Sequence, residues 1–187
     1  MGLRVTVPVA MSPDQAARDL APRLSALAGE RAPASPHGEG ARAKRAVPVV
    51  TIDGYSGSGK STLAAALARL VNGWQVLHLD DWYPGWDGLE AGADIARRIA
   101  ADLRAGRASS YEAWDWENDT TGATTRVPLA PTIIEGCGAI EAEADLSVWI
   151  ADPGEDERRS RALARDGQTY APHWQRWADQ DLGRPVK

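Results

Sequence analysis

The segment from Gly54 to Ser61 reads Gly-Tyr-Ser-Gly-Ser-Gly-Lys-Ser and fits the pattern G-x-x-x-x-G-K-[ST] at every fixed position. Glycines allow a loop to turn tightly, so that several backbone N–H groups point inward and can bind phosphate oxygens. Lys60 would reach the β- and γ-phosphates of a nucleotide, and the Ser61 hydroxyl would ligate Mg²⁺. The motif therefore predicts a phosphate-binding loop for a nucleoside triphosphate. Its expected binding residues are Gly54, Ser56, Gly57, Ser58, Gly59, Lys60, Ser61 and Thr62.

The residues on either side of this segment are those that a phosphate-binding loop requires. An apolar, β-branched run over 47–52 leads in as a strand, and a helical pattern over 61–71 leads out. The N-terminus of that helix adds a partial positive charge beside the loop. A Gly/Ser turn that matches by chance is the alternative, and the strand–loop–helix context argues against it.

Acidic residues follow the ends of three predicted strands: Asp53, the pair Asp80 and Asp81, and Glu135. The carboxyl ends of parallel strands meet at one edge of a sheet, so these carboxylates should face the phosphate loop. Phosphoryl transfer to a hydroxyl needs a group that accepts or orients the hydroxyl proton, which suits Asp80. It also needs a carboxylate near Mg²⁺, which suits Glu135. Strand-end caps are the alternative, and we expect that role for Asp81.

A charged helix is expected over 155–166. Arg158, Arg161 and Arg165 recur in it at spacings of three and four, so they share one face. A row of guanidinium groups suits a lid that closes on phosphates. A solvated helix, whose arginines pair with the acidic residues at 155–157, explains the same pattern equally well.

Beyond residue 46 the chain alternates strand and helix patterns. Strands are expected at 47–53, 75–79, 132–135 and 146–150, and helices at 61–71, 89–103 and 155–166. The polar, aromatic stretch at 109–125 has no assigned element. This order predicts an α/β fold with a parallel sheet and helices on both faces.

Residues 1–46 are expected to form an N-terminal extension and linker, apart from a second unit at 47–187. The residues from Ser12 to Asp14 suit a helix start, and leucines follow at helical spacing from Leu20 to Leu27. The stretch 29–45 is rich in Pro, Gly, Ala and Arg, as mobile linkers are. A disordered leader is the alternative.

The composition narrows the classes of function. The chain has 187 residues, of which 43% are hydrophobic, enough for the core of one domain. A net charge of −5 gives no support for nucleic-acid binding. No apolar run reaches the ~18 residues of a membrane span, and the single cysteine, Cys137, excludes an intrachain disulfide. We therefore expect a cytoplasmic protein with no nucleic-acid and no membrane partner.

Taken together, these segments resemble the uridine kinase family of P-loop kinases, in its actinobacterial uridine kinase-like branch. The segment 78–83 (HLDDWY) looks like the family's Asp-x-Phe-Tyr motif, and 114–116 (WDW) resembles its Tyr-Asp-Phe motif. The segment 133–136 (IIEG) resembles its strand ending in Glu-Gly. The arginines of the charged helix, followed by Asp166, fall at the spacing of its arginine lid. The resemblance covers about residues 47–170 and implies the α/β P-loop NTPase fold of a kinase.

The resemblance also implies roles for single residues. Asp80 would accept the proton of a nucleoside 5′-hydroxyl, and Lys60, Arg161 and Arg165 would be the other catalytic residues. Ser61 and Glu135 would lie at the Mg²⁺. The implied activity is ATP- and Mg²⁺-dependent phosphoryl transfer to a hydroxyl of a nucleoside-like small molecule. Its binding residues would be Asp80, Tyr83, Trp114, Asp115 and Trp116.

Two departures from the family keep other functions open. The segment 117–119 (END) stands where well-known uridine kinases carry a histidine that contacts the base. The family also continues past the lid into a last strand, whereas this sequence ends at Lys187, and an oligomer would be one way to complete the site. One alternative is a P-loop kinase for another acceptor, such as a sugar or a vitamin precursor. The other is a nucleotide-binding regulatory protein with little catalysis.

Overall fold

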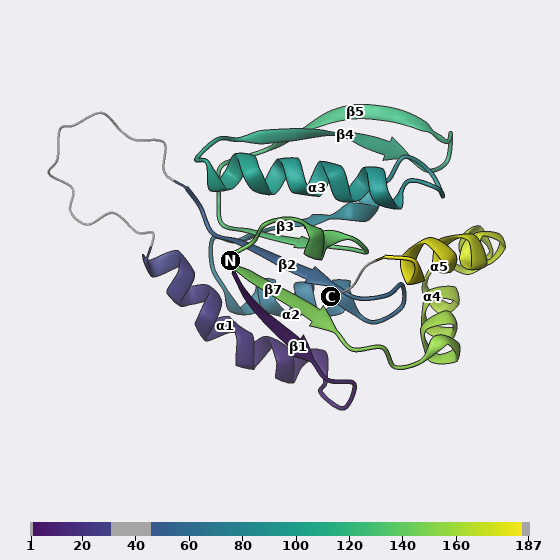
Figure 1. The fold of residues 1–187 in the computed structure, drawn as a ribbon, viewed down its shortest axis with the longest axis horizontal. Helices are drawn as coiled ribbons and strands as arrows, with labels where there is room; N and C mark the ends of the chain where they lie inside the picture. Colours follow the sequence, from purple (N-terminus) through teal and green to yellow (C-terminus); the bar gives the residue numbers. More distant parts are fainter. Residues whose placement is uncertain (1, 31–45, 185–187) are drawn as a thin grey trace, which may run out of the picture.

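The centre of the molecule is a five-stranded sheet in which all strands run parallel, in the order β1-β7-β2-β6-β3 (Figure 1). The structure is a computed structural model, and it describes residues 2–30 and 46–184. The parallel sheet expected from the sequence is thereby confirmed. Its strands are β1 (Leu3–Val7), β7 (Leu146–Ile150), β2 (Val49–Asp53), β6 (Thr132–Glu135) and β3 (Gln75–His78).

The central strands are buried on both faces, which explains their β-branched sequences. Every residue of β2 (VVTID) and of β6 (TIIE) is buried. In the ladder Ile52 of β2 lies beside Glu135, and His78 of β3 lies beside Glu135 on the other side. The register therefore brings Asp53, His78 and Glu135 to one edge of the sheet, where ligands of parallel sheets bind.

Helices cover both faces of the sheet (Figure 1). Helices α1 (Pro13–Glu30) and α2 (Lys60–Leu70) share one hydrophobic core, and α3 (Leu89–Arg104) belongs to the other. Successive strand residues alternate between these cores, because successive side chains of a strand point to opposite faces. Ile133 thus packs in the core of α1 and α2, and Ile134 in the core of α3.

A two-stranded antiparallel sheet lies beyond α3 and was not predicted. It consists of β4 (Ser109–Asp115) and β5 (Thr120–Val127). All residues of β5 except Val127 are exposed, so the strand lacks the alternation of apolar and polar residues that would reveal it. Tyr111 of β4 packs against Trp82, with ring centroids 4.6 Å apart, and fixes the hairpin to the main body.

The last two helices lie at the carboxyl end of the sheet (Figure 1). Helix α4 (Glu155–Tyr170) runs past its expected end at residue 166, with a break at Gly167, whose φ is 58° and ψ is −135°. Helix α5 (Trp174–Leu182) was not predicted. It buries Trp174 and Trp177, which in a chain without phenylalanine serve as large core groups.

The expected separation of residues 1–46 does not hold where the structure describes them. Strand β1 pairs with β7 along its whole length, from Leu3 beside Leu146 to Val7 beside Ile150. Helix α1 begins at Pro13 as predicted, and its Leu20 and Leu24 are buried against α2. The described part of the expected extension therefore shares one sheet and one core with the phosphate loop, because the β7 edge and the α2 surface would otherwise be open. Most of the expected linker, at 31–45, lies outside the described residues.

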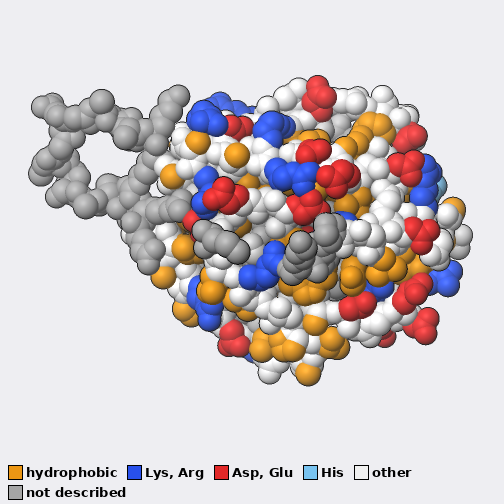
Figure 2. Space-filling model, viewed as in Figure 1, with side chains coloured by type: hydrophobic (Ala, Val, Ile, Leu, Met, Phe, Trp, Pro, Cys, Tyr) orange, Lys and Arg blue, Asp and Glu red, His pale blue; other side chains and the backbone are white. Residues whose placement is uncertain are grey.

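The surface carries mixed charge. On the face drawn in Figure 2, acidic and basic side chains of the described residues are interspersed. Among the described residues, no helix has both the length and the apolar character needed to cross a membrane.

The packing of α1 predicts that the N-terminal helix contributes to global stability. Leu24 is fully buried, whereas Leu70 of α2 is 50% exposed. Leu24→Ala should lower the free energy of unfolding by about 2–5 kcal/mol, because it leaves a cavity in the core. Leu70→Ala, the matched control, should cost well under half of that. Urea unfolding of both variants measures the difference, and equal small losses would mean that α1 folds apart from the sheet.

Candidate functional site

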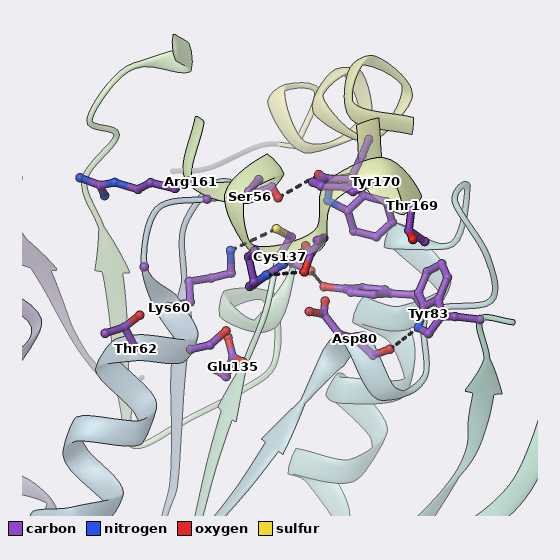
Figure 3. A pocket seen from close by; sticks show the side chains of 18 of the residues that line it. Ser56, Lys60, Thr62, Asp80, Tyr83, Glu135, Cys137, Arg161, Thr169 and Tyr170 are labelled. Atoms are coloured by element: carbon purple, nitrogen blue, oxygen red, sulfur yellow. Dashed lines mark hydrogen bonds and ion pairs between the residues drawn. The ribbon is translucent and has the colours of Figure 1, made fainter. Parts of the chain in front are cut away.

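A cavity of about 840 Å³ opens at the carboxyl end of the sheet, between the phosphate loop and α4 (Figure 3). It brings together most of the residues that the sequence singled out. The predicted site residues that line the cavity are Ser56, Gly57, Gly59, Lys60, Ser61, Thr62, Asp80, Tyr83, Trp116, Glu135, Arg161 and Arg165.

The phosphate loop connects the buried end of β2 to the first turn of α2. Gly57 and Gly59 have φ values of 79° and 105°, a left-handed region that glycine adopts without strain. Gly59 caps α2, so Lys60, Ser61 and Thr62 form the helix's first turn, where backbone N–H groups have no partner within the helix. Two residues of the loop, Gly54 and Ser58, are buried and do not line the cavity. The Ser58 N–H donates to the Tyr55 carbonyl at 3.0 Å.

Lys60 bends back over its own loop. Its Nζ donates to the carbonyl oxygens of Gly54 and Tyr55, at 2.9 and 3.1 Å, and lies 3.4 Å from the sulfur of Cys137. Burial alone would lower the pKa of Lys60, but the nearby Cys137 and the carboxylates around the loop raise it overall. The ammonium group therefore stays charged and is held at the cavity wall.

Asp80 enters the cavity from the short 3-10 turn that follows β3 (Leu79–Asp81). Its side chain is open to the cavity, yet the surrounding protein desolvates it. This desolvation, followed by repulsion from Glu135, raises the pKa of Asp80, while Lys60 and Arg165 act to lower it. The Asp80 carbonyl accepts a hydrogen bond from Trp116 Nε1 at 2.8 Å, which ties the turn to the end of β4. Asp81 is exposed and accepts a long hydrogen bond from Tyr111, 3.4 Å, outside the lining of the cavity.

Glu135 ends β6 and is only 3% exposed. Its Oε1 lies 2.6 Å from His78 Nδ1, the residue beside it in the ladder. This hydrogen bond is the main cause that raises the pKa of His78, against a smaller opposing effect of burial. His78 was expected only as part of the HLDDWY motif, and the strand register is what pairs it with Glu135.

The donor chemistry of the cavity fits Mg²⁺ and a nucleotide. Mg²⁺ takes hard oxygen ligands and commonly keeps waters and substrate phosphates beside one or two carboxylates. The Ser61 hydroxyl and the carboxylates of Glu135 and Asp80 are such ligands and line the same cavity. The described residues hold no cluster of three or more His, Cys, Asp or Glu side chains that could bind a metal on their own.

The arginines of α4 divide into two groups. Arg158 is turned inward and 2% exposed; it donates to Asp152 at 2.8 Å and to the Ser56 carbonyl at 3.3 Å. Arg161 and Arg165 line the cavity and are half exposed, each paired with an acidic neighbour on α4 (Glu157 and Asp166). The predicted row of three is thus split, because the helix rests on the loop through Arg158.

Aromatic side chains form the wall beside Asp80. Tyr83 is buried, donates its hydroxyl to the Cys137 carbonyl at 2.6 Å, and packs against Trp177. Trp86 contacts Trp116 and stacks parallel to Tyr170, with ring centroids 4.8 and 5.4 Å away. Tyr170 and Trp177, which also line the cavity, were not predicted, because α5 and the end of α4 were not predicted.

Two predicted substrate residues lie outside the lining of this cavity, Trp114 and Asp115. Asp115 instead accepts hydrogen bonds from the backbone N–H groups of Glu117 and Asn118, at 3.0 and 3.1 Å. These bonds form the turn between β4 and β5. The pKa of Asp115 is lowered mainly by its hydrogen bond with the Asn118 side chain, and further by the two backbone bonds. Of the WDW segment, Trp116 alone is among the residues that line this cavity.

The contact between the loop and α4 leads to a prediction with a matched control. A Cβ at Gly57 would lie 2.2 Å from the Arg158 carbonyl oxygen, whereas nothing lies within 4 Å of one at Gly73. Their φ values are nearly equal, 79° and 76°. Gly73→Ala should cost about 1–2 kcal/mol of backbone strain, and Gly57→Ala a further ~1–3 kcal/mol, because α4 must move. Chemical denaturation compares them, and equal losses would show that α4 does not rest on the loop.

Similarity to known proteins is found at the level of the fold. No protein-family profile matches the chain, and no curated protein matches it. A solved structure assigned as a fructose transport system kinase, from Silicibacter sp. TM1040, is 22% identical, with 90% of this chain and 88% of the other covered and a TM-score of 0.50. A possible uridine kinase from Bacillus stearothermophilus is 20% identical, with 90% and 98% covered and a TM-score of 0.45. The chain thus has an α/β P-loop kinase fold, as the sequence predicted.

Proposed function

We propose that this protein transfers the γ-phosphoryl group of ATP, with Mg²⁺, to a hydroxyl of a small molecule, and that the acceptor is nucleoside-like. The observation that carries the proposal is the convergence of Lys60, Asp80, Glu135 and Arg165 on one cavity at the end of a parallel sheet. These are a phosphate-binding cation, a candidate base, a metal-type carboxylate and a second cation. Phosphoryl transfer requires that combination.

The loop and its lysine bind the phosphates. ATP supplies the phosphoryl group, and Mg²⁺ neutralises phosphate charge. The backbone N–H groups of Gly57, Gly59, Lys60 and Ser61 would bind phosphate oxygens, and the Lys60 ammonium would stabilise the negative charge that builds up on them. Ser61 and Glu135 would hold the metal, and the hydrogen bond with His78 orients the Glu135 carboxylate.

Asp80 receives the acceptor. Its carboxylate accepts the hydroxyl proton, which makes the acceptor oxygen a better nucleophile. The raised pKa of Asp80 strengthens it as a base, provided that it is ionised at the working pH. Arg161 and Arg165 stabilise charge on the transferring group once they exchange their acidic neighbours for phosphate oxygens.

The aromatic residues beside Asp80 favour an acceptor that carries a planar ring. Tyr83 and Trp116 line the cavity beside Asp80, and aromatic rings bind planar or apolar surfaces by stacking. A nucleoside offers both a ring that stacks and a hydroxyl that Asp80 can reach. An acceptor panel that also holds sugars and vitamin precursors decides between this class and other hydroxyl compounds.

Two variants separate binding of the nucleotide from transfer. Lys60→Ala should lower Mg·ATP turnover by ~10²–10³-fold or more, because it removes a charge that stabilises the transition state. Asp80→Asn should keep the dissociation constant of Mg·ATP within about threefold yet lower kcat by ~10²–10⁴-fold, because only the base is lost. ADP release is measured with each acceptor of the panel, and ATP binding by calorimetry.

Asp81→Asn is the control, since this neighbour is exposed and outside the cavity lining. It should retain most of the activity. Full phosphotransfer by Asp80→Asn would refute the acceptor assignment. Tight ATP binding without turnover on any acceptor would favour a regulatory nucleotide-binding protein.

A further inference from the structure

A buried ionic network connects the end of β2 with the C-terminal helix. It consists of Asp53, Asp181 and Arg184, which are 0, 1 and 9% exposed. Arg184 donates to both oxygens of Asp53, at 2.8 and 3.1 Å, and to Asp181 Oδ1 through Nε and Nη2, at 3.0 and 2.7 Å. Burial favours loss of the Arg184 charge, but the hydrogen bonds to Asp53 and the charges of both carboxylates raise its pKa, so the network stays ionic.

The second oxygen of Asp181 reaches the phosphate loop itself. Asp181 Oδ2 accepts the backbone N–H of Ser56 at 2.8 Å and lies 3.4 Å from the sulfur of Cys137. The peptide unit that carries this N–H also carries the carbonyl of Tyr55. That carbonyl accepts a hydrogen bond from Lys60 Nζ at 3.1 Å. Because a peptide unit is planar, the orientation of its N–H fixes the orientation of its carbonyl. The Asp181 carboxylate and the Lys60 ammonium thus hold one peptide from its two sides.

The helix that carries Asp181 is itself fixed. Trp177 packs against Tyr83, with ring centroids 4.7 Å apart. Gln180 Nε2 donates to the Trp86 carbonyl at 2.8 Å, and Arg176 forms an ion pair with Asp87. These contacts hold α5 against the segment 83–87, on the aromatic side of the cavity. Asp181 therefore approaches the loop from a rigid support.

We infer that Asp181 is a positioning residue for Lys60: it fixes the peptide between Tyr55 and Ser56, whose carbonyl holds the ammonium group at the cavity wall. The inference rests on the proposed function in that Lys60 binds ATP phosphates. The charge of Asp181 alone would have the opposite effect, because a carboxylate near a phosphate site weakens the binding of anions. Geometry and charge thus predict opposite effects of removing Asp181, which makes the inference testable.

The test compares two variants that lose the same charge. Asp181→Asn keeps an oxygen that can accept the Ser56 N–H, whereas Asp181→Ala leaves that N–H without an acceptor. Asp179→Ala on the same helix is the control, because Asp179 is exposed and its side chain accepts a hydrogen bond from Gln175, one turn earlier on the helix.

Hydrogen exchange of the unliganded protein reports on the loop directly. Asp181→Ala should speed exchange in peptides that cover residues 54–60 by about tenfold or more, and leave β6 unchanged. Asp181→Asn should exchange within about threefold of the wild type, and Asp179→Ala at the wild-type rate. Unchanged exchange at 54–60 in Asp181→Ala would overturn the inference.

Calorimetry with Mg·ATP, well below the melting temperature, measures the consequence for binding. Asp181→Ala should weaken binding about five- to tenfold, and Asp181→Asn should stay within about threefold. Tighter binding by both variants would show that charge alone matters and would overturn the inference. If Asp181→Ala does not fold, Asp181→Ser, whose shorter side chain falls away from Ser56, takes its place. Lack of ATP binding by the wild type would refute the proposed function, while the exchange rates still decide the role of Asp181.

Discussion

The hydrogen bonds of a single buried carboxylate determine where the parts of this site meet. Asp53 is fully buried, and a carboxylate in that position is tolerated only if donors surround it. Its five donor atoms come from three segments: the N–H of Gly54, the N–H groups of Gly138 and Ile140, and two nitrogens of Arg184. The start of the phosphate loop, the turn after β6 and the C-terminal region are therefore joined at one point. The position of Lys60 relative to Glu135 depends on that junction.

The site combines a rigid floor with adaptable side chains. The floor is fixed by backbone contacts, such as that between Gly57 and the Arg158 carbonyl, and by fully buried groups. Arg161 and Arg165, in contrast, are half exposed, and each forms an ion pair with an acidic neighbour on its own helix. Such exposed pairs contribute little to stability, so they can be exchanged for a ligand at low energetic cost. Phosphoryl transfer benefits from a rigid loop that holds the phosphates and from arginine side chains that can move to pair with the bound phosphates.

The sequence predicted what depends on local pattern. The phosphate loop, the central strands and the helices after β2 and β3 each have a clear signature of glycine spacing or hydrophobic period, and the acidic residues at strand ends follow from the parallel sheet. Partners far apart in sequence were not predictable in this way. The pairing of Asp181 with Ser56, the burial of Arg158 and the contact of His78 with Glu135 depend on tertiary packing. Strand β1 (LRVTV) does alternate apolar and polar residues, but it is only five residues long and was not assigned. Strand β5 was missed because nearly all of it is exposed.

The place of β1 has a consequence for how the chain assembles. Strand β1 pairs with β7, so all the segments between them must be made before Leu3 can pair with Leu146. Until then β1 and the buried side of α1 have no sheet edge to join. Pairings so distant in sequence slow folding and leave hydrophobic surface open to other chains. Expression yield and aggregation during synthesis should thus be governed by this late closure at the β7 edge, even though the phosphate loop and its helix are complete much earlier.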